Sequence, residues 1–126
     1  MTEKKYTAEL ADLHYKEGIL FVKYRAGEIT LPQAKVFIAV VAQEFGEILP
    51  ARLLFDISAI KSPKKEVRDY LGSGELDKYT KASAIIANSV IEKILGNLFL
   101  TFTRPKWPTK IFTDETAALA WLQQIK

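Results

Sequence analysis

The sequence predicts an α/β fold with about five strands in a mixed sheet and about four helices, in the order β-β-α-β-α-β-α-β-α. Strand-like apolar runs alternate with helical patterns after residue 30, and two of those helices open with capping-box spacings. Residues 51–59 predict a strand that is covered on both faces, because most of them are apolar. This alternation implies right-handed crossovers and a mostly parallel sheet with one antiparallel strand.

The composition is typical of a globular domain. The chain has 126 residues, of which 48% are hydrophobic and 26% are charged, so we expect one sizeable core. Residues 1–5 are expected to form a loose tail and residues 6–126 a single domain. The chain has no cysteine and shows neither a secretory signal nor an apolar run long enough for a bilayer, which favours a cytoplasmic, non-transmembrane protein. Its net charge of +3 is too mild and too mixed for a nucleic-acid interface.

The first elements are a hairpin and a helix. Residues 6–24 predict two strands joined by a tight turn at residues 16–18. Thr30 and Gln33 have the spacing of a capping box, apolar residues follow at helical intervals, and Gly46 ends the helix.

The central elements begin with the strand at residues 51–59. Ser62 and Pro63 predict an N-cap followed by proline in the first turn of a helix, which Gly72 interrupts. The next strand covers residues 82–87, and Ser89 with Glu92 predicts the start of the most hydrophobic helix.

The last elements are a short strand at residues 109–112 and a final helix that begins near Asp114. The carboxyl ends of parallel strands usually carry the binding groups of such folds. We therefore expect residues 56–65 and 87–92 to form the working edge.

The chain resembles the STAS domains, named for sulfate transporters and anti-sigma factor antagonists, and in particular their lipid-binding-like and uncharacterised bacterial variants. The resemblance rests on the element order, on Leu53-Leu-Phe-Asp-Ile-Ser58 before a helix, and on the ending Ile111-Phe-Thr-Asp-Glu-Thr-Ala-Ala-Leu-Ala-Trp-Leu122. It implies a single-domain STAS-like fold. In the antagonists a serine at the corresponding helix start is phosphorylated by a partner kinase, and only Ser62 occupies a comparable position here. Its neighbours Lys61 and Pro63 depart from the antagonists' Asp-Ser-Ser-Gly sequence. The resemblance therefore implies that Ser62 occupies the corresponding position, but it does not imply that Ser62 is phosphorylated.

Two interpretations of the Ser62 region stay open. Ser62 can simply cap the helix. Alternatively, a phosphate on Ser62 or on a ligand rests at the helix start beside Lys61, Lys64 and Lys65. Side chains with expected turn or supporting roles complete this edge, namely Asp56, Ser58, Asn88 and Ser89.

The helix after Ser89 carries more apolar side chains than one buried stripe can hold. These residues, with a nearby loop tryptophan, are candidates for extra core, a subunit contact or one wall of an apolar pocket. They are Leu98, Phe99, Phe102 and Trp107.

The sequence contains no paired acid, base or nucleophile spacing, so we expect no catalytic residues, metal site or cofactor. The first hypothesis is a non-enzymatic regulatory module that binds a protein partner, with Ser62 as a switch. The alternative is a carrier or sensor of a small apolar, lipid-like ligand, which a closed apolar cavity on the order of a few hundred Å³ would favour. A homodimer is left open.

Overall fold

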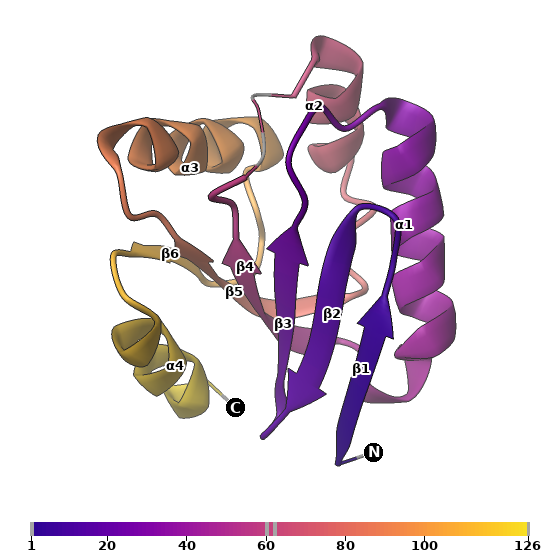
Figure 1. Cartoon of the computed structure of the whole chain (residues 1–126), viewed down its shortest axis with the longest axis vertical. Helices are drawn as coiled ribbons and strands as arrows, with labels where there is room; N and C mark the ends of the chain where they lie inside the picture. The colour runs from indigo at the N-terminus through magenta and orange to yellow at the C-terminus, as the bar shows by residue number, and fades with distance from the viewer. Residues whose placement is uncertain (1, 60, 62, 126) are drawn as a thin grey trace.

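The computed structural model describes residues 2–59, 61 and 63–125, without the side chains of Phe102 and Thr103. A six-stranded sheet lies at its centre, with the strands in chain order (Figure 1). Strands β1 to β3 pair antiparallel and β3 to β6 pair parallel, so β2 runs against the others, as predicted. The strands are β1 (Glu3–Thr7), β2 (Ala11–Lys16), β3 (Ile19–Tyr24), β4 (Ala51–Asp56), β5 (Thr80–Ile86) and β6 (Thr109–Phe112). The helices are α1 (Leu31–Glu44), the 3-10 helix η1 (Gly46–Ile48), α2 (Lys65–Leu71), α3 (Val90–Thr103) and α4 (Glu115–Gln124).

The amino-terminal segment corrects two predictions. We expected a loose tail over residues 1–5 and five strands, but Glu3–Thr7 forms the sixth strand, β1, paired with β2. Its first three residues, Glu3, Lys4 and Lys5, are all charged, which conceals the strand in the sequence, and such charges help edge strands to avoid pairing with other chains. Lys4 ties the strand to the end of α1, because its Nζ donates to the Glu44 carbonyl oxygen at 2.7 Å.

The four α-helices divide unequally between the faces of the sheet. Each crossover from β3 to β6 steps to the neighbouring strand in the same direction, so α1, α2 and α3 lie on one face. Helix α4 covers the other face (Figure 1). Within the described chain, none of the helices is both long enough and apolar enough to cross a membrane.

On the α4 face, small side chains allow close packing. Ala82 and Ala84 of β5 and Ala118 of α4 are completely buried in one cluster with Leu122. A side chain from β4 also reaches this helix: Arg52 Nη1 donates to the carbonyl oxygens of Leu122 at 3.3 Å and Ile125 at 3.1 Å. The sequence offered no sign that a cation in a buried strand would secure the end of α4.

Three helix starts follow the capping signals of the sequence. Thr30 and Gln33 form the predicted capping box of α1. Ser89 Oγ accepts from Glu92 N at 3.1 Å at the start of α3. Asp114 Oδ1 accepts from Ala117 N at 2.8 Å at the start of α4. These caps satisfy backbone N–H groups that have no partner inside the helix.

Helix α2 starts later than predicted. Its N-cap is Lys64, which makes no side-chain capping bond, so the expected cap at Ser62 with Pro63 in the first turn is wrong. The preceding loop is held against the loop after β3, where Gly27 N donates to Ala59 O and Lys61 N donates to Gly27 O. These two backbone hydrogen bonds fix Ala59 and Lys61 beside the loop after β3.

Candidate functional site

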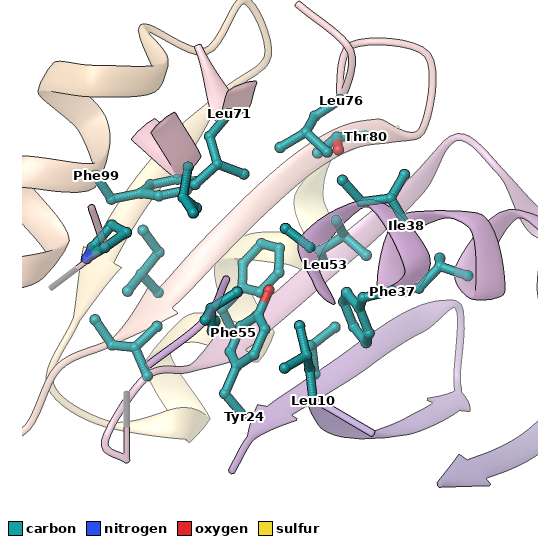
Figure 2. Close-up of a pocket in the computed structure, with 18 of the residues that line it drawn as sticks. Leu10, Tyr24, Phe37, Ile38, Leu53, Phe55, Leu71, Leu76, Thr80 and Phe99 are labelled. Carbon is teal, nitrogen blue, oxygen red and sulfur yellow. The ribbon is translucent and has the colours of Figure 1, made fainter. Parts of the chain in front are cut away.

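The most prominent feature of the structure is an apolar cavity of about 160 Å³ between the sheet and the layer of α1, α2 and α3 (Figure 2). Its lining is formed almost entirely by aliphatic and aromatic side chains from both layers. The cavity therefore lies inside the core between two layers, at a place that large side chains normally fill.

The floor of the cavity is the α1 side of strands β3 to β5. Tyr24 stands at the end of β3, and its ring stacks on Phe55 of β4 with 6.2 Å between the ring centres. It also meets Phe37 of α1 at 5.8 Å. Leu53 and Ile85 continue the floor across β4 and β5. These residues alternate with those on the α4 face, as the two-residue period of a strand requires.

The roof is built by the three helices and one loop. Ala34, Phe37 and Ile38 come from α1, and Val67 and Leu71 from α2. Helix α3 and the loop after it contribute Leu95, Leu98, Phe99 and Trp107.

Few polar groups reach this cavity. The Tyr24 and Thr80 side chains bring hydroxyls to it, and Lys61 lies in its wall with an exposed side chain. Trp107 Nε1 is already engaged, because it donates to Ser83 Oγ at 3.1 Å. This arrangement suits a ligand that is mostly apolar.

Comparison with known proteins places the sequence in a family. A domain of unknown function, DUF7793, matches residues 13–126. The chain belongs to the DUF7793 family. No curated protein matches it.

Solved structures with the same fold exist for other families. One is an uncharacterised protein of the DUF3478 family with a SpoIIAA-like fold from Shewanella loihica, with 21% identity, a TM-score of 0.60, and coverage of 96% of this chain and 92% of that chain. Another is an anti-sigma factor antagonist from Mycobacterium paratuberculosis, with 13% identity, a TM-score of 0.53, and coverage of 97% and 95%. These likenesses confirm that the DUF7793 chain has the predicted STAS-like fold.

In this DUF7793 chain, three of the four residues predicted for a pocket or interface line the cavity. They are Leu98, Phe99 and Trp107. The side chain of Phe102 lies outside the described part of the structure. Leu98 is 37% exposed and so lies at the rim.

The expected anion site is only partly described. Ser62 itself lies outside the described residues, while its neighbours Lys61 and Pro63 both line the cavity. Lys64 is exposed, and Lys65 Nζ pairs with Asp69 Oδ2 at 2.7 Å, one turn further along α2. The Lys65 charge is therefore already balanced in part by a carboxylate.

The other residues expected at this edge shape two loops. Asp56 Oδ1 accepts from Ser58 N at 3.0 Å, which is the geometry of an Asx-turn after β4. After β5, Asn88 N donates to Glu92 Oε1 at 3.3 Å, next to the cap made by Ser89. Within the described ranges, no three side chains from His, Asp and Glu come together as a metal site.

Sequence reasoning missed much of the cavity, including Tyr24, Phe37, Phe55 and Thr80. Each reads as an ordinary core residue of its own strand or helix. Only the sheet order brings them together, so no local pattern could have identified them.

A second apolar surface extends along α3 from the rim of the cavity. Val90, Ile91 and Ile94 are 74%, 71% and 54% exposed, and together with Leu98 they fall within one side of the helix. We call these four residues the α3 stripe. Exposed apolar surfaces of this kind mark sites of interaction.

Proposed function

We propose that the chain is a non-enzymatic, STAS-type regulatory module that carries or senses a small apolar molecule in the cavity between its sheet and α1, α2 and α3. The cavity is the observation that supports this function. Its apolar walls provide binding by burial of the ligand's surface, and no reactive group is needed.

The size of the cavity limits the ligand. Apolar cavities of about 150 Å³ remain dry and accept benzene or xenon. At about 160 Å³, this cavity is smaller than the carrier hypothesis required and suits a single ring or a short alkyl chain better than a complete lipid.

Benzene tests this proposal as a probe. We expect the protein to bind benzene with a dissociation constant of about 0.1–1 mM, which corresponds to roughly 4–5.5 kcal/mol for six carbon atoms. At a free concentration of about ten times that constant, linkage predicts a gain in unfolding free energy of about 1.4 kcal/mol. Isothermal titration and thermal unfolding measure the two effects. No heat of binding and no rise in melting temperature would refute the proposal.

A second candidate function is the binding of a regulatory protein partner through the α3 stripe. The exposure of Val90, Ile91 and Ile94 favours it. One protein of the same fold is an anti-sigma factor antagonist, and such a role for this chain would need surface complementarity instead of catalytic groups. Phosphate binding near Ser62, or its phosphorylation, remains a prediction that would add a switch to such a surface.

Introducing charges on α3 tests this second function. The double substitution Ile91→Asp and Ile94→Asp should abolish co-purification of a partner from source-cell extract, because it places two carboxylates on the stripe. Val36→Asp is the matched control, since Val36 is 58% exposed but lies on α1. We expect this control to retain the partner. Equal retention by both variants, or equal loss, would contradict a role for the α3 stripe.

A further inference from the structure

The Tyr24 hydroxyl is an unusual group inside the cavity. Its ring is held from two sides by Phe37 and Phe55, and Figure 2 shows its oxygen turned toward the interior of the cavity. No hydrogen bond joins this hydroxyl to another described residue, and its oxygen keeps accessible surface, because every fully buried side-chain nitrogen or oxygen in the described part of the chain has a partner. A ligand in the cavity can therefore reach this oxygen, and a ligand that hydrogen-bonds to it makes a contact that a hydrocarbon cannot make.

The surroundings keep this group uncharged. Burial raises the pKa of Tyr24 above its ordinary value, because the phenolate would be poorly solvated there. The neutral phenol can both donate and accept one hydrogen bond. A neutral ligand therefore pairs with it more readily than an ion does.

A second hydroxyl lies in the same cavity. Thr80 is only 7% exposed, and its side chain also makes no hydrogen bond to the described residues. By contrast, the polar atoms of Trp107 and Ser83 are paired with each other. Tyr24 and Thr80 thus bring to the apolar lining two hydroxyls that are not bonded to any of the described residues.

We infer that the ligand is a small neutral molecule with an apolar body, such as one aromatic ring, and a single hydroxyl or carbonyl group that hydrogen-bonds to the Tyr24 hydroxyl. This inference rests on the proposed function and specifies its ligand. The apolar body fills the space between the sheet and α1 to α3. The polar group selects this ligand over a plain hydrocarbon of the same size.

Phenol and benzene form the test pair, since they differ by one hydroxyl. In a cavity without a polar partner, phenol would bind more weakly than benzene, because its hydroxyl would be buried without a hydrogen bond. In the wild-type protein we expect phenol to bind more tightly than benzene. Benzoate, which matches the ring but carries a charge, should bind more weakly than either.

Tyr24→Phe removes the hydroxyl and keeps the ring contacts. Titration calorimetry should show the ratio of phenol to benzene affinity falling roughly tenfold in this variant. The benzene affinity itself should change by less than about twofold. Tyr15→Phe is the matched control, because Tyr15 packs on the same core cluster but does not line the cavity. It should leave the ratio unchanged.

The outcomes separate the two proposals. If benzene binds but Tyr24→Phe leaves the ratio of phenol to benzene affinity unchanged, the proposed role of Tyr24 is refuted while the cavity function stands. The same conclusion follows if the wild-type protein binds benzene or benzoate more tightly than phenol. If neither benzene nor phenol binds, both proposals are overturned. The preference of the wild-type protein is informative even if a variant fails to fold.

Discussion

Replacing Ala34 with leucine should abolish benzene binding and raise stability together. Ala34 is buried on α1 and lines the cavity, so the longer side chain would occupy space that a ligand needs. Filling part of a cavity of this kind should increase the unfolding free energy by about 1 kcal/mol. We expect benzene affinity to fall by at least about 30-fold, as measured by calorimetry beside urea unfolding.

Ala39→Leu on the same helix is the control for this change. Ala39 is exposed, so the same substitution there should alter stability by less than about 0.5 kcal/mol and leave benzene affinity intact. Undiminished benzene binding by Ala34→Leu would show that the ligand does not occupy the cavity. A loss of stability would show that no space is available beside Ala34.

Replacing Arg52 with methionine should lower the unfolding free energy by about 2–3 kcal/mol. The Arg52 guanidinium holds the last carbonyl oxygens of α4, at Leu122 and Ile125, and its Nε donates to Gly18 O at 3.3 Å. Methionine retains much of the apolar stem but leaves these carbonyl groups without their donor. Urea unfolding measures the loss, and amide exchange should show that protection falls first in α4.

Lys81→Met is the matched control for Arg52→Met. Lys81 also lies in a central strand, but its side chain is exposed. Its replacement should change stability by no more than about 0.5 kcal/mol. An Arg52→Met protein as stable as Lys81→Met would contradict the anchoring of α4 by Arg52.

Most of the fold was predictable because its signals are local. The caps at Thr30, Ser89 and Asp114 each occur where a side-chain oxygen meets an unpaired N–H group at a helix start. The cap predicted at Ser62 was wrong because α2 begins only after Lys64, and the loop before it is held by the backbone pairing of Lys61 with Gly27. That pairing joins distant parts of the chain.

Strand β1 was missed for a related reason. Its sequence begins with three consecutive charged residues and has no strong apolar face, so its stability depends on pairing with β2 and on contacts such as Lys4 with Glu44. Local propensity contributes little to such an edge strand.

The candidate site was predictable only in part. Leu98 and Phe99 were predicted because α3 has too many apolar residues for one buried stripe, and Trp107 because it is a tryptophan in the loop after that helix. Tyr24 and Phe55 were not predicted as site residues, because an aromatic residue in a strand normally belongs to the core. On the α4 side of the sheet, Ala82, Ala84 and Ala118 are fully buried, whereas the cavity lies on the side of α1, α2 and α3.

Crystals of the protein under xenon pressure test the central claim most directly, because xenon enters dry apolar cavities without needing a specific contact. We predict a xenon peak between the sheet and the α1–α3 layer, in contact with Phe55 and Phe99, and its loss in Ala34→Leu crystals. Side chains filling that space, with no xenon peak there in the wild-type protein, would contradict the account.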